Sequence, residues 1–125
     1  MSVDWQSLAR AAGIQVDGEW LVVVIGARKQ RVRVRVDADD RGLTLDSRVA
    51  APSVVDRMPD PHDRIWAQNR LSELVGFRLD GRNRLTGKSW VPAAGLMPEE
   101  FAFYVRNLAV ACDRLELVLT GDDAY

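Results

Sequence analysis

The most regular pattern in the 125-residue chain is a strict alternation of apolar and cationic residues within residues 30–37. Successive side chains of a β-strand point to opposite faces of a sheet, so this alternation predicts a strand with one apolar and one cationic face. The apolar positions are Val32, Val34 and Val36, and the cationic positions are Arg31, Arg33 and Arg35.

Further strands are predicted on both sides of this segment. Residues 19–25 form an apolar run rich in β-branched residues, which predicts a strand that is either buried on both faces or packed against a helix. Residues 26–29 fit a hairpin connection to the cationic strand. Turn-forming residues at 39–42 precede a third strand, whose apolar positions are Leu43, Leu45 and Val49. Three strands joined by short turns predict an antiparallel meander.

The middle of the chain predicts an irregular crossover followed by a helix. Prolines at positions 52 and 59 favour irregular backbone, after which Asp60 can cap a helix and Pro61 suits its first turn. The predicted buried face of this helix consists of Ala67, Leu71 and Leu74, flanked by Trp66 and Val75. Gly76 is expected to end the helix, and residues 77–80 and 84–91 are expected to form a fourth and a fifth strand.

Both ends of the chain predict helices. A short helix follows Ser2 or Asp4, either of which can cap it, and ends at Gly13. A longer amphipathic helix begins at Pro98 and ends near Gly121. The apolar positions are Trp5, Leu8, Ala9 and Ala12 in the first helix, and Phe101, Tyr104, Leu108, Cys112 (or Ala111), Leu115 and Val118 in the last.

The predicted order of elements is α-β-β-β-α-β-β-α, which defines the fold class as α+β. We expect a single antiparallel sheet of about five strands covered by helices. No linker, repeat or low-complexity segment interrupts residues 1–125, so the chain is predicted to form one domain.

Composition and charge narrow the class of function. The 17 basic and 18 acidic residues give a net charge of −1, which does not favour bulk nucleic-acid binding. One cysteine and one histidine cannot form a disulfide or a Cys/His zinc site. The sequence has no secretory signal and no apolar run long enough to cross a bilayer. We therefore expect a cytoplasmic protein without a membrane or nucleic-acid partner.

No combination of residues predicts catalysis or a bound cofactor. The segment 81–89 has five residues between its glycines, whereas a phosphate-binding loop needs four, so it is better explained as a hairpin. His62 is expected to be exposed at a helix start, and Cys112 falls on an apolar helix stripe. Acidic clusters are explained by turns and helix capping, not by a metal site. We predict no catalytic, cofactor-binding or metal-binding residues and no enzymatic activity.

The strongest candidates for partner binding are Arg31, Arg33 and Arg35, together with Trp90. On a strand these three cations lie about 6.6 Å apart along one face. They either form a docking surface for an acidic segment or for phosphates, or they are a solvated face balanced by carboxylates such as Asp46. Trp90 ends a strand beside Pro92, where an amphipathic ring is typical of an interface.

Several segments resemble the YbjN family of bacterial sensory-transduction regulators, which shares the fold of type III secretion chaperones. The segments are residues 66–70, 75–80, 90–92, 98–101, 104–109 and 112–114. The resemblance implies a type III secretion chaperone-like fold for the whole chain. It also implies a small, often dimeric domain without an active site, described as regulatory or chaperone-like.

The functional hypothesis is a non-enzymatic, single-domain protein that binds another polypeptide and works as a homodimer. The segment would be captured on the sheet or helix face by backbone pairing and by the Arg31, Arg33 and Arg35 face. One alternative is a small-molecule or nucleotide sensor that binds an anion between this strand and the loop around Arg82 and Arg84. A second alternative is a small enzyme.

Overall fold

The computed structural model describes residues 3–120, within which four helices and six strands are assigned. The helices are α1 (Trp5–Ala11), α2 (Pro52–Val55), α3 (Pro61–Leu71) and α4 (Pro98–Thr120). The strands are β1 (Gln15–Asp17), β2 (Trp20–Ile25), β3 (Arg28–Val36), β4 (Gly42–Ala50), β5 (Gly76–Leu79) and β6 (Leu85–Pro92). The predicted helix cap at Ser2 and the predicted end near Gly121 lie outside the described residues, whereas Asp4 caps α1 by accepting a hydrogen bond from the Ser7 amide.

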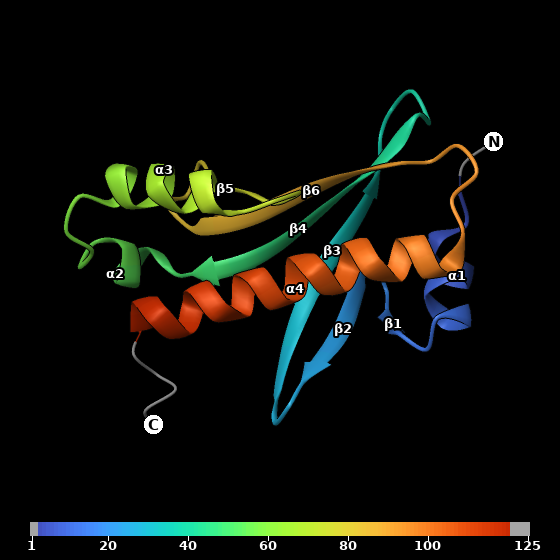
Figure 1. Ribbon diagram of the computed structural model, residues 1–125, viewed down its shortest axis with the longest axis horizontal. Coiled ribbons are helices and arrows are strands. Elements are labelled where there is room, and N and C mark those ends of the chain that lie inside the picture. The colour runs from blue at the N-terminus through green and yellow to red at the C-terminus, as the bar shows by residue number, and fades with distance from the viewer. Residues whose placement is uncertain (1–2, 121–125) are drawn as a thin grey trace.

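The strands form one antiparallel sheet in the order β1-β2-β3-β4-β6-β5 (Figure 1). β2, β3 and β4 follow one another as the predicted meander, with Ile25 paired to Arg28 across a two-residue turn. The β5–β6 hairpin joins through β6, whose Lys88 pairs with Asp46 of β4. The predicted α+β class with a single antiparallel sheet is therefore confirmed.

The long helix α4 covers one face of this sheet (Figure 1). Its apolar stripe meets the inward side chains of β3, β4 and β6, and α1 packs beside it. The fully buried side chains at this contact include Leu43, Leu45, Val32, Leu85, Phe101, Val105, Leu108 and Cys112. Burial of this apolar surface is the main favourable contribution to the stability of the domain.

Two expectations about the strands are corrected. β1 was not predicted, and it raises the number of strands to six; its three residues are too short to show an alternating pattern. Of the two alternatives for β2, burial on both faces is wrong, because its side chains alternate and Val24 is 64% exposed, whereas its inward face contacts α4. Helices pack on only one side of β2, so its apolar run leaves valines on the open side.

The predicted buried face of α3 is wrong. Ile65 is its buried residue, whereas Leu71 is 81% exposed and Ala67 is also exposed. The reason is that α3 lies beside the outer edge of β5 instead of over the sheet. The side-chain amide of Asn69 donates to the Phe77 carbonyl at 3.0 Å and its oxygen accepts from the Phe77 amide at 2.7 Å, so it takes the place of a neighbouring strand.

Two smaller differences concern helices. The crossover predicted to be irregular contains one helical turn, α2, which begins at Pro52. In α4 the buried stripe includes Val105, while Tyr104 is only half-buried and Val118 is 64% exposed. The predicted apolar stripe identified the correct helix, but Tyr104 and Val118 lie one residue away from the helix face that the sheet covers.

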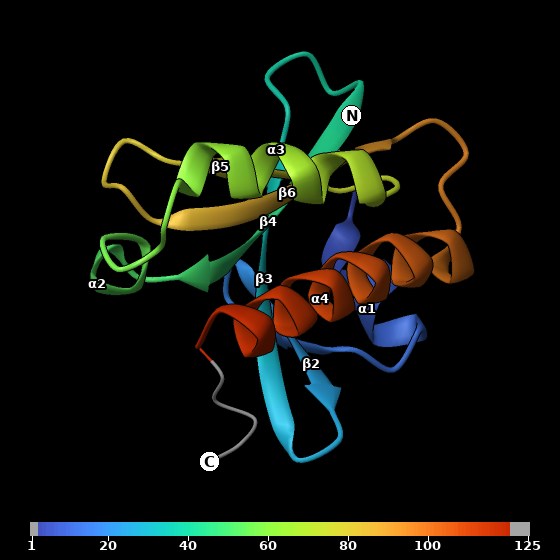
Figure 2. The ribbon, with the colours of Figure 1, turned by 60° about the vertical axis from the view of Figure 1, so that its left-hand side comes forward.

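The β2–β3 hairpin extends past α4 (Figure 2), and polar side chains hold it in place. β3 pairs with β4 from Arg33 to Val36, and beyond this stretch the side-chain amide of Gln30 donates to Ser47 Oγ at 2.7 Å. Near the hairpin turn, Arg28 forms two hydrogen bonds with the buried carboxylate of Asp113 on α4, at 3.0 and 2.7 Å. The ion pair therefore joins the hairpin to the helix.

Replacing Arg28 by alanine is expected to lower the free energy of unfolding by about 1–3 kcal/mol, because the Asp113 carboxylate would remain buried without its charged donor. Chemical denaturation monitored by circular dichroism measures this change. Lys29→Ala, at the exposed neighbouring position, is the matched control and should change stability by less than about 0.5 kcal/mol. Equal effects of the two substitutions would show that the ion pair does not hold the hairpin.

Candidate protein-binding surface

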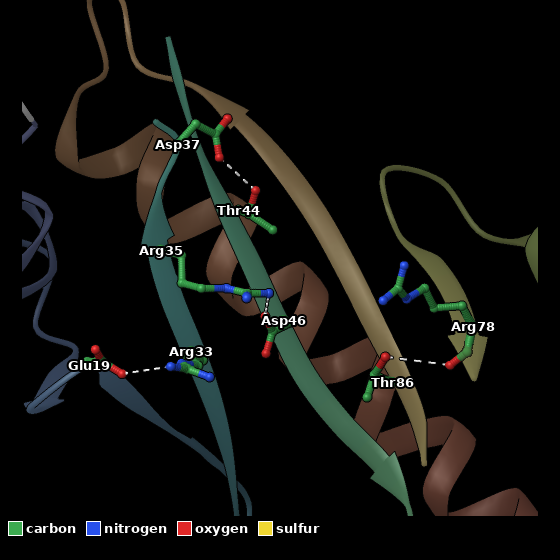
Figure 3. Close-up of polar contacts among 8 residues, drawn as sticks. All are labelled: Glu19, Arg33, Arg35, Asp37, Thr44, Asp46, Arg78 and Thr86. Carbon is green, nitrogen blue, oxygen red and sulfur yellow. Dashed lines mark hydrogen bonds and ion pairs between the residues drawn. The ribbon is translucent and has the colours of Figure 1, made fainter. Parts of the chain in front are cut away.

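The face of the sheet opposite α4 is open to solvent, and we call it the open sheet face (Figure 3). It carries the outward side chains of β2 to β6, all exposed or half-buried. The three predicted arginines of β3 lie on it, with Asp46 of β4 between them and β6. Trp90 of β6 lies on the same face, because Arg35 pairs with Thr44 and Thr44 pairs with Trp90.

On the open sheet face, Arg31, Arg33 and Arg35 of β3 are each paired with a carboxylate. Arg31 also stacks over the ring of Trp20, with its guanidinium carbon 4.9 Å from the ring centre. The nitrogen–oxygen distances are 3.1 Å for Arg31–Asp17, 3.0 Å for Arg33–Glu19 and 2.8 Å for Arg35–Asp46. The charge of this row is thus balanced locally, and Asp46 is one of the partners that the solvated-face alternative requires.

Trp90 is fixed in the structure of this face although it is 55% exposed. Its ring lies directly against Gly42 and leaves no room for a Cβ atom there. The indole nitrogen donates to the Asp37 carboxylate at 2.7 Å, and Thr44 donates to the other oxygen of Asp37 at 2.9 Å. Trp90 therefore presents a rigid apolar ring at one end of the open sheet face.

The sequence interpretation missed a second group of cations on this face. Arg48 of β4 pairs with Thr86 of β6, and Thr86 pairs with Arg78 of β5. Lys88 follows two residues after Thr86 and points to the same side. In Figure 3 the guanidinium of Arg78 extends from β5 toward β6. The alternation along β6 places Thr86, Lys88 and Trp90 on one face of that strand. Only the order of the strands shows which residues of β4 and β5 lie beside them.

The two groups of cations line one shallow hollow of about 430 Å³ on the open sheet face. Arg33 and Arg35 lie at one end of its lining, and Arg82 and Arg84 of the β5–β6 turn at the other. The structure thus brings together the β3 strand and the turn that the sensor alternative singled out. The lining contains seven cationic residues and two carboxylates, Asp46 and Asp80.

Asp80 shapes the turn that presents Arg82 and Arg84. Its carboxylate accepts hydrogen bonds from the Arg84 amide at 3.0 Å and the Arg82 amide at 2.8 Å, and from Arg84 Nε at 2.8 Å. The bond from the Arg84 amide, followed by that from Arg82, lowers the pKa of Asp80 to about 2. Asp80 is therefore ionised and fully engaged at neutral pH.

A second hollow of about 610 Å³ lies between α1 and α4, away from the open sheet face. Its lining is mainly apolar and includes Ala102, Phe103 and Val110, and Phe103 is 58% exposed. Arg106 donates to the carbonyl of Ala12 at 3.1 Å and joins the two helices there. This groove is the helix-side surface available to a partner.

The sheet also differs in how its edges are closed. Asn69 occupies the main-chain groups of Phe77 at the outer edge of β5. At the other side, β1 pairs only with residues 20–22 of β2. Within the described part of the chain, residues 23–25 of β2 have β3 on one side and no strand on the other. This short segment is open to pairing with an added strand.

His62 and Cys112, whose side-chain types often serve in catalysis, lie apart from these surfaces. His62 is exposed on the first turn of α3, and Cys112 is completely buried under the sheet. Burial raises the pKa of the Cys112 thiol to about 12, so the thiol is protonated at neutral pH. Between residues 3 and 120 there is no group of three metal-ligating side chains, and no helix there has the length and apolar character to span a membrane.

The fold is that of YbjN and of the type III secretion chaperones, as the resemblance implied. A chain of the crystal structure of the ExsC–ExsE complex matches with a TM-score of 0.68 and 19% identity, over 95% of this chain and 97% of that chain. YbjN from E. coli matches with a TM-score of 0.70 and 16% identity, over 95% of this chain and 90% of its own.

A third match is in the structure of the Yersinia pestis type III secretion chaperone SycH in complex with a stable fragment of YscM2. Its TM-score is 0.59 with 15% identity, over 88% of this chain and 94% of that chain. No protein-family profile and no curated protein sequence matches the chain. The TM-scores establish a shared fold, and sequence identities below 20% do not identify binding residues.

Proposed function

We propose that the protein is a non-enzymatic, chaperone-like or regulatory domain that captures a segment of another polypeptide on the open sheet face. The observation that carries the proposal is that, within residues 3–120, helices cover only one face of the sheet, while the other presents a hollow lined by charged side chains and flanked by Trp90. The fold is also found in structures of chaperones bound to another protein, including SycH with a fragment of YscM2.

The interactions available on this face suit an extended segment. Guanidinium groups offer several donors to backbone carbonyls and carboxylates, and Trp20 and Trp90 offer apolar surface. The open edge at residues 23–25 of β2 adds unpaired main-chain groups that a segment can meet as an added strand. Arg33 and Arg35 of β3 would add hydrogen bonds to the segment beside the ion pairs that they already form.

Replacing Arg33 and Arg35 together by glutamine should reduce copurification of a defined polypeptide partner from the native lysate by about tenfold. The partner is identified by mass spectrometry after affinity purification of the wild-type protein, with nuclease treatment to exclude bridging nucleic acid. The physical reason is the loss of two charged donors at the centre of the open sheet face.

The matched control is Arg10→Gln with Arg57→Gln, two exposed arginines outside the hollow, which should leave copurification unchanged. Melting temperatures of all variants establish that the fold persists. If the wild-type protein retained no polypeptide, or if the Arg33 and Arg35 substitutions had no effect, capture on this face would be contradicted.

We also propose that the protein works as a homodimer that associates through α3 and the residues that follow it. Trp66, Leu71 and Leu74 are large apolar residues that are 62, 81 and 55% exposed. They were expected to be buried, and α3 leaves them at the surface because it lies at the edge of the sheet. A second copy that buries this patch would remove apolar surface from water on both protomers.

Multi-angle light scattering should give a mass of twice 14.0 kDa for the wild-type protein. Leu71→Glu should shift the mass to that of the monomer, because two charges would be buried at the interface. Val24→Glu, at another exposed apolar position, should leave the dimer intact. A wild-type protein of 14.0 kDa at high concentration would contradict the dimer.

A second candidate function, a sensor for a nucleotide or another small anion, is favoured by one observation. The hollow brings Arg33 and Arg35 of β3 together with Arg82 and Arg84 of the turn. A sensor should be stabilised by several degrees in a thermal-shift screen of nucleotides and phosphorylated metabolites, and Arg82→Ser should abolish the shift. The same screen without any shift would leave polypeptide capture as the function of the hollow.

A further inference from the structure

Three cationic side chains surround Thr86 on the open sheet face, and each comes from a different strand. Arg48 of β4 and Arg78 of β5 lie directly across from Thr86 on its two sides. Lys88 lies two residues further along β6. Side chains directly opposite one another in a sheet have Cβ atoms about 5 Å apart. With Arg82 of the adjoining turn, which lines the same hollow, these cations form what we call the Thr86 cluster.

Within the described chain, the Thr86 cluster differs from the arginines of β3 in forming no ion pair, although the backbone of Lys88 lies opposite Asp46. Among residues 3–120 none of its four cations forms an ion pair, whereas every arginine of β3 does. The two carboxylates nearest to it in the hollow are already engaged. Asp46 is held by Arg35 at 2.8 Å, and Asp80 is held by Arg84 at 2.8 Å.

An uncompensated group of like charges does not stabilise the fold. Arg48 and Arg78 each lie diagonally from Lys88 on a neighbouring strand, and like charges at such positions repel one another. The three cations around Thr86 therefore gain nothing from one another. They gain from an anion that enters the hollow, where several guanidinium and ammonium donors can reach it at once.

The width of the hollow across the strands favours an extended anionic peptide over a single phosphate. Its lining runs from Trp20 of β2 across β3, β4 and β6 to Arg78 of β5. Neighbouring strands lie about 4.8 Å apart, so five strands span about 19 Å. A single phosphate reaches only one part of this width. An extended peptide covers it with about six residues.

We infer that the Thr86 cluster holds the carboxylates of an acidic segment about six residues long, which is the part of the captured polypeptide that lies on the open sheet face. This inference rests on the proposed function and adds the chemistry of the partner. Because ion pairs already neutralise the arginines of β3, the β3 side of the open sheet face offers the segment hydrogen bonds and the apolar surface of Trp20. The Thr86 cluster contributes the net attraction.

A fluorescein-labelled decapeptide of alternating glutamate and serine tests the inference by fluorescence anisotropy. The wild-type protein should bind it, and raising the salt concentration from about 20 to about 200 mM should weaken binding, because exposed charges are screened. Arg78→Glu with Lys88→Glu should weaken binding by about tenfold or more. A peptide with glutamine in place of glutamate should not bind.

The matched control is Arg10→Glu with Arg114→Glu, which changes the net charge by the same amount at exposed positions on α1 and α4. It should bind the glutamate peptide like the wild type. Equal loss in both double variants would reduce the effect to net charge and overturn the inference. Equal binding of the glutamine peptide, or tighter binding of a ten-residue thymidine oligonucleotide, would overturn it as well.

The failure of this inference can be told from the failure of the proposed function. If the copurified partner were retained in full by Arg78→Glu with Lys88→Glu, capture would stand and the acidic character of the segment would be wrong. If no polypeptide copurified with the wild-type protein while the glutamate peptide still bound to the Thr86 cluster, the anion site would stand and capture would be wrong.

Discussion

The packing of α4 against one face of the sheet is the contact on which the rest of the structure depends. Phe101, Val105, Leu108 and Cys112 of this helix are completely buried against the inward residues of the strands. Because α4 covers one face and α3 goes to the edge, the opposite face must be made of residues that tolerate water. The alternation of valine and arginine along β3 reflects this difference, because the valines face α4 and the arginines face water.

Ion pairs balance the cationic side chains on only one part of the open sheet face. On the β3 side the carboxylates of Asp17, Glu19 and Asp46 balance the arginines. On the β5–β6 side the Thr86 cluster has no such partners within the described chain. The imbalance, within a fold also found in chaperones bound to other proteins, is the physical basis for proposing a polypeptide ligand.

The sequence predicted the elements that follow a repeating pattern. The alternation at residues 30–37 and the long stripe after Pro98 identified β3 and α4, because each pattern extends over at least four turns or pleats. It could not predict β1, which has three residues, or the edge position of α3. That position depends on two hydrogen bonds from Asn69, which no periodicity records.

The candidate site was predictable to the same extent. The sequence of a single strand was enough to find four of the candidate residues, which are Arg31, Arg33, Arg35 and Trp90. The structure places all four on one face of the sheet. Arg48 and Arg78 were missed since their importance arises from the order β4-β6-β5, which places a later strand between them. A pattern within one segment cannot give the neighbours of that segment.

Hydrogen exchange of the protein with and without its copurified polypeptide partner tests most directly which surface binds. Slowed exchange of β3, β5 and β6 amides on binding, with α1 and the first half of α4 unchanged, is the expected result. Slowed exchange confined to the α1–α4 groove around Phe103 would place the partner on the helix side and contradict capture on the open sheet face.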